Sequence, residues 1–481
     1  MKAVSLTLLC ASCLLTAVTV AAEAMVASAG ARNPGGDATH HKQINRDAFS
    51  HASANMSFER EIDFKVGNGF FKRLWVTAPA STQSADGLGP LYNARSCQRC
   101  HLKDGRGHPP NGADDDAVSM FLRVSIPPQD AEQQALLDGG RVGNIPEPAY
   151  GLQLQDFAIP GHRAEYRLGV RYDDLPVALG DGTVVTLRSP TYTAEDLGFG
   201  PLHPQAQLSP RVAQQMLGLG LLEAIAEDDI VAAADPDDRD GDGISGRPNR
   251  VWSGELGRVA LGRFGHKAGM PSISEQSQAA FNGDIGISVP LHPDAAGDCT
   301  VAQTACRAAP NGNSPQQDNL EADRRIVDLV VFYARNLAVP ARRDADHPDV
   351  VAGEALFHAS GCAACHTPSH RTRGDEAVAI EQRGQTIWPY TDLLLHDMGE
   401  GLADHRPEAL ASGSEWRTAP LWGIGLTPVV NGHDHYLHDG RARGVLEAVL
   451  WHDGEARAAR DSVAAMSKTE RDQLVRFVES L

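Results

Sequence analysis

Two short stretches decide the fold of this chain, Ser96-Cys97-Gln98-Arg99-Cys100-His101 and Gly361-Cys362-Ala363-Ala364-Cys365-His366. Both contain the pattern C-x-x-C-H, in which two thiols can reach the two vinyl groups of one porphyrin and the next imidazole can reach its iron. A zinc ribbon would need the two cysteine pairs close together, and a thioredoxin-like motif does not explain a histidine after both pairs. The sequence therefore predicts two covalently bound haem c groups, held by Cys97, Cys100, His101, Cys362, Cys365 and His366.

Length and composition set broad limits on the class of protein. The chain has 481 residues, of which 42% are hydrophobic and 22% charged, and its formal net charge is −19. This length predicts two or three domains, and the composition excludes disordered and collagen-like classes. The acidic balance argues against nucleic acid and anionic membranes as main partners, and is compatible with a basic partner protein.

The N-terminal segment has the pattern of a secretory signal. Lys2 precedes an apolar run that ends in Ala22-Glu23-Ala24, and an A-x-A site predicts cleavage after Ala24. A membrane anchor is the alternative, but the run is barely long enough to span a bilayer. A lipoprotein would use Cys13, although Cys10 stands where an aliphatic residue is required. We expect a periplasmic protein with no integral membrane segment in the mature chain.

The remaining cysteines fit an oxidising compartment. Cys10 and Cys13 lie within the signal segment, residues 1–24, and are expected to be lost with it. Cys299 and Cys306 form a close pair in a polar loop, for which a local disulfide is the expected state.

Charge and turn patterns indicate how the rest of the chain is organised. Residues 25–55 are polar and predict a flexible arm, and residues 340–350 are the best candidate for a linker. Alternating residues within 118–190 predict a small β insertion, with a hairpin turning at Gly180-Asp181-Gly182. Helices are predicted at residues 209–226, 321–337 and 469–481.

An acidic loop matches the start of an EF-hand-type calcium site. Asp238, Asp240, Asp242 and Ile244 stand at the alternate positions that wrap one hard cation. Asn249 occupies the place of the usual twelfth-residue Glu, so a solvated acidic turn is the alternative interpretation.

Taken together, several stretches resemble the di-haem cytochrome c peroxidase and MauG superfamily, in particular its di-haem oxidoreductase (thiol oxidoreductase-like) branch. They span most of the mature chain: NARSCQRCH (93–101), DGDGISGRPN (240–249), GRFG (262–265), NLAVP (336–340), DLLLHDMG (392–399), EWRTAPLWG (415–423) and LHDGRAR (437–443). The resemblance implies a mainly α fold of two cytochrome c-type domains. The first would cover residues 56–340, with the β insertion at about 118–190 and the acidic loop at 238–249, and the second residues 350–481.

The resemblance also implies a second axial ligand for the C-terminal haem. In the relatives a Tyr-Phe-His-Asp-Gly stretch precedes that ligand by fourteen residues. Here fourteen residues beyond His438 lies His452, which would give bis-histidine iron of rather low potential. Met398 is the competing ligand. In the relatives, calcium between the domains is held just before this stretch, at positions occupied here by His433 and His435, so that site is doubtful.

For the N-terminal haem, the resemblance implies distal residues. A Trp between the haems, a Gln and a Glu correspond here to His266, Gln276 and Asp284. Gln276 would donate a hydrogen bond to peroxide and Asp284 would shuttle a proton. His266 would lie between the haems, or would ligate the N-terminal iron and close it.

The resemblance therefore implies a haem-dependent oxidoreductase that reacts with hydrogen peroxide or another small oxidant at the N-terminal haem. Electrons would come through the C-terminal haem from a small redox protein or a quinol-linked carrier. A non-catalytic electron carrier with both irons six-coordinate is the alternative. Thiol oxidation has little support, because no cysteine remains after two haems and one disulfide.

Overall fold

The computed structural model describes residues 31–112, 115 and 119–481, so the predicted signal segment lies outside the described residues. Its α-helices are α2 (Phe58–Lys72), α3 (Cys97–Cys100), α4 (Ala131–Asp138), α5 (Leu219–Glu223), α6 (Glu227–Ala232), α7 (Ile273–Gly283), α8 (Thr304–Arg307), α9 (Arg324–Arg335), α10 (Pro348–Ala359), α11 (Thr427–Asn431), α12 (Val445–Trp451), α13 (Arg457–Ala465) and α14 (Lys468–Ser480). The strands pair antiparallel as β1 (Leu91–Tyr92) with β3 (Phe157–Ala158), β2 (Met120–Ser125) with β6 (Gln207–Val212), β4 (Arg167–Ala178) with β5 (Val184–Glu195), β7 (Arg250–Ser253) with β8 (Arg258–Leu261), β9 (His370–Arg371) with β10 (Thr386–Ile387), β11 (Leu395–Asp397) with β12 (Glu415–Arg417), and β13 (His435–Tyr436) with β14 (Ala442–Arg443).

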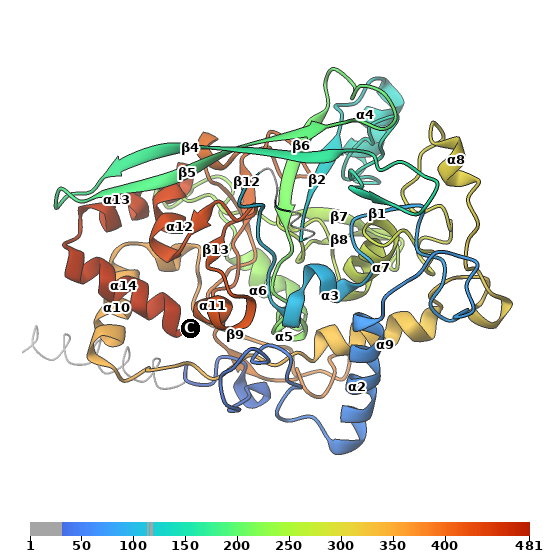
Figure 1. Ribbon diagram of the computed structural model, residues 1–481. Helices are drawn as coiled ribbons and strands as arrows, with labels where there is room; N and C mark the ends of the chain where they lie inside the picture. Colours follow the sequence, from blue (N-terminus) through green and yellow to red (C-terminus); the bar gives the residue numbers. More distant parts are fainter. Residues whose placement is uncertain (1–30, 113–114, 116–118) are drawn as a thin grey trace, which may run out of the picture.

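The prediction of a mainly α fold is wrong. Helices hold 30% of the residues and strands 19%, in seven two-stranded sheets, so the fold is mixed α and β. The segments that join the helices are long, and they satisfy their backbone N–H and C=O groups by pairing locally into short ladders. These ladders lie around the helices, with the long β4–β5 hairpin running along one edge of the molecule (Figure 1).

Two pairs of helices cross at a glycine, and each pair lies beside one C-x-x-C-H motif. A Cβ atom at Gly67 of α2 would collide with the carbonyl oxygen of Leu329 in α9, and one at Gly353 of α10 with that of Gln473 in α14. Only glycine allows so close an approach of two backbones. The chain therefore contains the same type of helix crossing twice.

Aromatic rings repeat around these two crossings. The centroids of Phe71 and Tyr333 lie 5.2 Å apart at the first crossing, and those of Phe357 and Phe477 lie 5.2 Å apart at the second. Phe71 and Phe357 each lie 6.3 Å from the histidine that follows the neighbouring cysteine pair. Each crossing thus supplies the apolar floor on which one motif rests.

Local signals in the sequence predicted several of these elements correctly. The helix expected at 321–337 is α9, which begins after Asp323, whose side chain accepts a hydrogen bond from the backbone N–H of Ile326. The expected hairpin is β4–β5, and the C-terminal helix is α14, which starts with a capping box between Ser467 and Glu470.

The helix predicted over residues 209–226 is wrong. Ser209 and Pro210 lie in β6, where Pro210 stands opposite Leu122 of β2. A short helix, α5, begins only after Gly218, which has a left-handed φ of 69°. Pairing with a strand far away in the sequence has overridden the local Ser-Pro helix signal.

Residues 31–55, expected to belong to a flexible arm, are packed against the body of the protein. Ala38, Ala48 and Phe49 are buried in the main hydrophobic core. The backbone N–H of His40 donates to the carbonyl of Val339 at 3.1 Å. This hydrogen bond holds the segment against the chain that follows α9. The prediction rested on the polar composition of this segment, but its few apolar side chains lie at positions that pack into the core.

The β4–β5 hairpin connects the two halves of the molecule. It leaves the N-terminal part and lies over α12 and α13 (Figure 1). Leu179 and Leu187 are buried in the hydrophobic core of the C-terminal part. At the tip, Gly180 N–H donates to the carbonyl of Ala464 at 2.8 Å, and Arg471 donates to Asp181 at 2.6 Å.

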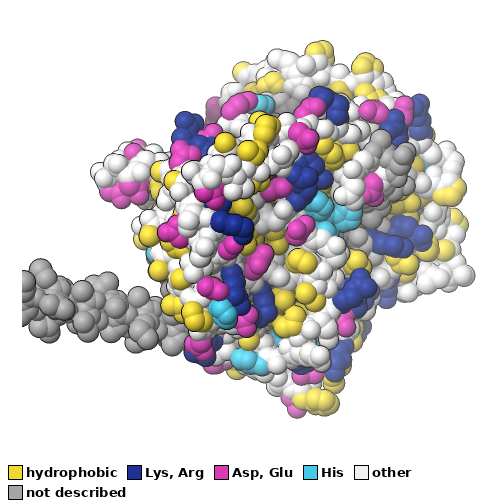
Figure 2. All heavy atoms as spheres, turned by 60° about the vertical axis from the view of Figure 1, so that its left-hand side comes forward, with side chains coloured by type: hydrophobic (Ala, Val, Ile, Leu, Met, Phe, Trp, Pro, Cys, Tyr) yellow, Lys and Arg dark blue, Asp and Glu magenta, His cyan; other side chains and the backbone are white. Residues whose placement is uncertain are grey.

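On the surface, acidic and basic side chains are interspersed over the face shown in Figure 2. Among the described residues, none of the helices has the length and apolar character needed to cross a bilayer.

The hairpin contact predicts a stability effect. Leu187 is 1% exposed in the C-terminal core, so Leu187→Ala is expected to cost about 2–5 kcal/mol in free energy of unfolding. Leu175→Ala is the matched control, because Leu175 lies in the same hairpin but is 43% exposed. Urea denaturation of the haem-loaded protein measures both variants. Equal effects would contradict the idea that the hairpin packs into the core.

Candidate functional site

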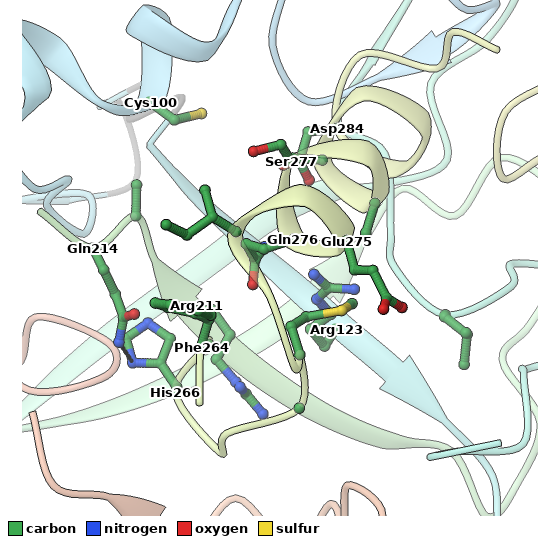
Figure 3. Close-up of a pocket in the computed structure, with 18 of the residues that line it drawn as sticks. Cys100, Arg123, Arg211, Gln214, Phe264, His266, Glu275, Gln276, Ser277 and Asp284 are labelled. Carbon is green, nitrogen blue, oxygen red and sulfur yellow. Dashed lines mark hydrogen bonds between the residues drawn. The ribbon is translucent and has the colours of Figure 1, made fainter. Parts of the chain in front are cut away.

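The first C-x-x-C-H motif forms part of the wall of a cavity of about 810 Å³. This volume lies within the range of about 300–1,000 Å³ that is common for cofactor sites. The motif comes from α3, and α7 supplies a second wall (Figure 3). Much of the lining is apolar and includes Phe71, Val212, Met216, Leu219, Phe264, Met270, Ile273, Ile285 and Val330.

The second motif lines a separate cavity of about 450 Å³ in the C-terminal part. Side chains from α10, α12 and α14 surround it, and again most are apolar. They include Phe357, Leu402, Leu421, Ile424, Val445, Val449, Leu474 and Val478. The two motifs therefore open onto two distinct cavities.

Three histidines in these walls share one hydrogen-bonding pattern. In each, Nδ1–H donates to a backbone carbonyl, which leaves a lone pair on Nε2 for a metal ion. The pairs are His101 with Gln214 (2.6 Å), His366 with Tyr390 (2.9 Å) and His452 with Ala448 (2.6 Å). Burial lowers the pKa of all three, that of His366 to about 4, so the rings are neutral as metal ligands must be.

His452 and His366 line the same cavity, where the charge of one lowers the pKa of the other. Met398, the competing candidate, also lines this cavity. The hydrogen bond to Ala448 occupies Nδ1 of His452 and leaves its Nε2 free as a ligand atom, which is consistent with the predicted role.

His266 differs from these histidines because the protein uses both of its ring nitrogens. Nε2–H donates to the carbonyl of Val212 at 2.9 Å, and Nδ1 accepts from the side-chain amide of Gln214 at 3.0 Å. Burial holds the pKa of His266 well below its usual value, so the ring is neutral. His266 and Gln214 line both cavities and so lie between them. This arrangement favours the place between the haems over the role of iron ligand.

Gln276 and Asp284 both line the first cavity, near opposite ends of α7 (Figure 3). The Gln276 side chain points into the cavity. Asp284 accepts a hydrogen bond from Gln153 at 2.7 Å and lies near Cys97 and Cys100, whose pKa values its charge helps to raise. Burial raises the pKa of Asp284 itself, so its carboxyl group holds a proton more readily than an exposed one.

Two arginines in the second cavity form no ion pair within the described part of the chain, although the charge of Asp392 partly offsets the lowering of the Arg417 pKa by burial. The hydrogen bonds of Arg106 and Arg417 go to the backbone carbonyls of Leu437, Gly265 and Thr418, and Arg106 Nε has no partner among the described residues. Burial lowers the pKa of both guanidinium groups to about 10. A buried cation without an anionic partner is costly. The two propionates of a haem supply the missing charge, so the residues present fit this cofactor.

The first cavity has a similar group of cations. Arg123, Arg211 and Arg406 line it (Figure 3 shows the first two). Glu408 pairs with both Arg211 and Arg406 at 3.2 Å, and Nε of Arg406 lacks a partner among the described residues. Here too the cavity offers positive charge to an anionic ligand.

A series of rings joins the two cavities. Trp416 stacks on His438 with centroids 3.8 Å apart and planes at 11°, and both line the second cavity. The edge of Trp416 also faces His266, 6.4 Å away between centroids. The ammonium group of Lys267 lies 4.5 Å from the Trp416 centroid.

His396 was not singled out by the sequence analysis, although it lies in the family-like stretch 392–399. It lines the second cavity, and its two ring nitrogens meet two carboxylates, Asp392 at 2.8 Å and Glu455 at 2.7 Å. Burial alone would lower the pKa of His396, but the hydrogen bonds to Asp392, Cys365 and Glu455 raise it to about 12. Asp392 lies four residues before His396, but Glu455 lies 59 residues away, so no spacing rule could have revealed the complete cluster.

The remaining predicted groups are the acidic loop, of which Asp242 and Ile244 line the second cavity, and the cysteine pair. Carboxylate oxygens of Asp238, Asp240 and Asp242 lie within 4.8 Å of one another, and their side chains accept hydrogen bonds from the backbone of the same turn, including Ile244 N–H. Calcium binding there stays a prediction. Cys299 and Cys306 form a disulfide.

Two cavities, each with a cysteine pair, neutral histidines and buried arginines, fit a protein that binds two haems. The chain belongs to the family described as "Di-haem oxidoreductase, putative peroxidase", whose family model matches residues 29–481. No curated protein matches the chain.

One similar solved structure is hydrazine synthase from Kuenenia stuttgartiensis, determined under 20 bar of xenon. It is 16% identical, with a TM-score of 0.22, over 38% of this chain and 63% of that chain, which is less than two thirds of its length.

The second cavity predicts a role for covalent attachment in stability. Cys362→Ala should remove one thioether bond, weaken retention of the C-terminal haem in denaturant and lower the melting temperature by several degrees. The Cys299→Ala/Cys306→Ala double variant is the control, since it removes a disulfide but should leave haem retention unchanged. Native thermal stability and haem retention in Cys362→Ala would contradict this.

Proposed function

We propose that this chain is an exported di-haem c-type oxidoreductase with peroxidase-like activity. The N-terminal haem, attached at Cys97 and Cys100, reacts with hydrogen peroxide or another small oxidant. The C-terminal haem, attached at Cys362 and Cys365, transfers electrons to it. The electron donor is a small redox protein or a quinol-linked carrier.

One observation carries this proposal, the difference between the two cavities. In the second, His452 has a free Nε2 beside His366, so the iron there can take two protein ligands. In the first, His266 has both nitrogens engaged by Val212 and Gln214. An iron with two protein ligands suits electron transfer, and an iron with a free coordination position suits activation of a small molecule.

A haem held by Cys97, Cys100 and His101 would supply the electron transfer to the O–O bond, and the chain supplies hydrogen bonds and protons. Reduction of one peroxide to two waters consumes two electrons and two protons. The Gln276 amide donates a hydrogen bond to bound peroxide, and Asp284, whose pKa is raised by burial, delivers protons. His101 stays oriented by its hydrogen bond to Gln214.

The alternative function is an electron carrier with both irons closed. His292 and Met270 also line the first cavity and carry atoms of the kind that can ligate iron. The oxidation and spin states of the two irons distinguish the alternatives.

Electron paramagnetic resonance of the oxidised and the half-reduced protein provides this test. We expect a high-spin signal in at least one of these states, and it should be lost when peroxide is added to the half-reduced protein. Gln276→Ala should slow the reaction with peroxide by about 100-fold, while Gln134→Ala, at an exposed site in α4, should not. Two low-spin irons in both states would support the electron carrier instead.

The rings between the cavities form the proposed electron route. Trp416→Phe should slow electron equilibration between the two haems several-fold, because Phe is harder to oxidise than Trp. Trp388→Phe is the matched control, since Trp388 packs against the C-terminal core but, among the described residues, makes no ring contact with His266, Trp416 or His438. Rapid-mixing spectroscopy of the half-reduced protein measures both rates. An unchanged rate in Trp416→Phe would exclude this route.

A further inference from the structure

His396 and Glu455 lie in the wall of the second cavity, beside the haem-attachment residue Cys365, and Asp392 completes a cluster with them through its contact with His396. His396 is 3% exposed. Its Nε2 lies 2.8 Å from Asp392, and its Nδ1 lies 2.7 Å from Glu455 and 3.5 Å from Cys365 Sγ. These contacts connect the ring directly to the second C-x-x-C-H motif.

With both carboxyl groups ionised, this geometry makes His396 a cation. Burial alone would raise the pKa of Glu455, but the hydrogen bonds around it lower the pKa of that carboxyl to about 2. A carboxylate accepts hydrogen bonds and cannot donate them, so a nitrogen facing one must carry a proton. Both nitrogens of His396 face carboxylates, and an imidazole with two N–H groups is positively charged.

The two carboxylates are themselves held in place. Glu455 accepts hydrogen bonds from the backbone and the hydroxyl of Ser245 at 3.1 and 2.6 Å and from the backbone of Asp397 at 3.2 Å. Asp392 accepts one from the backbone of Leu394 at 2.9 Å. The cluster is therefore a set of three fixed charges that side-chain rotation does not relax.

We propose that this cluster sets the reduction potential of the C-terminal haem, with His396 raising it and the two carboxylates lowering it. The inference rests on the proposed electron-transfer role of that haem and adds residues that the role does not require. His396 also donates N–H toward the sulfur of Cys365. This contact would hold the edge of the attached haem close to the positive charge of His396.

The direction of each effect follows from Coulomb's law. Reduction adds one negative charge to the haem, which a nearby cation stabilises and a nearby anion destabilises. The interaction is strong because the groups are buried, where water screens charge poorly. Removing the cation should therefore lower the potential, and removing one anion should raise it.

Spectroelectrochemical titration of the haem-loaded protein tests this proposal. His396→Gln should lower the midpoint potential of the C-terminal haem by an amount equal to about a tenfold change in its reduction equilibrium constant, or 59 mV for one electron. Glu455→Gln, which is nearly isosteric, should raise it. Both variants should leave the potential of the N-terminal haem unchanged, because His396 and Glu455 line only the other cavity.

His405→Gln is the matched control. His405 also pairs with a carboxylate, Glu400 at 3.1 Å, but both side chains are exposed, so the C-terminal potential should not change. Opposite shifts in His396→Gln and Glu455→Gln support the proposal, and shifts of the same sign or none overturn it. If His396→Gln does not fold, the direction in Glu455→Gln decides alone.

The potentials are measured without peroxide, so this test is independent of the proposed peroxidase activity. If the two variants shift the potential in opposite directions but the protein does not react with peroxide, the proposed role of the cluster stands and the peroxidase function is excluded. If the protein reduces peroxide but neither variant shifts the potential, the peroxidase function stands and the role of the cluster is excluded.

Discussion

Backbone contact at two glycines is the constraint on which this structure depends. Gly67 lets α2 touch α9, and Gly353 lets α10 touch α14. Each contact brings a phenylalanine to the same distance from the histidine of a C-x-x-C-H motif. A methyl group at either glycine would push the helices apart and move the floor of one cavity, so both cavities depend on the absence of a single side chain.

Around these helix pairs the protein buries an unusual amount of charge. Lys267 is fully buried beside Asp404, and Arg106 and Arg417 line the second cavity with their hydrogen bonds directed to backbone carbonyls. Buried charges are costly in free energy unless groups of opposite charge lie beside them. In the described part of the chain the acidic surface and the cationic cavity walls thus have different functions, one facing water and the other an anionic cofactor.

Sequence reasoning succeeded where a signal is local and failed where contacts are distant. The C-x-x-C-H motifs, α9 and the β4–β5 hairpin follow from spacing, capping and turn residues within one segment. The mainly α fold was wrong because strands such as β6 pair with partners far along the chain. The charged state of His396 depends on Glu455, which sequence proximity does not place beside it. The tautomer of His266 depends on Val212 at the end of β6 and on Gln214.

The hairpin also affects how the molecule could be divided. Leu179 and Leu187 belong to the first half in sequence but to the core of the second half in space, and Trp422 does the opposite by entering the main core. Cutting the chain between residues 340 and 350 would expose apolar core surface on both fragments. Neither half can therefore be used alone as a domain for fusion or for attachment to an electrode. Because each core contains side chains from the other half of the sequence, the spacing between the two cavities is fixed.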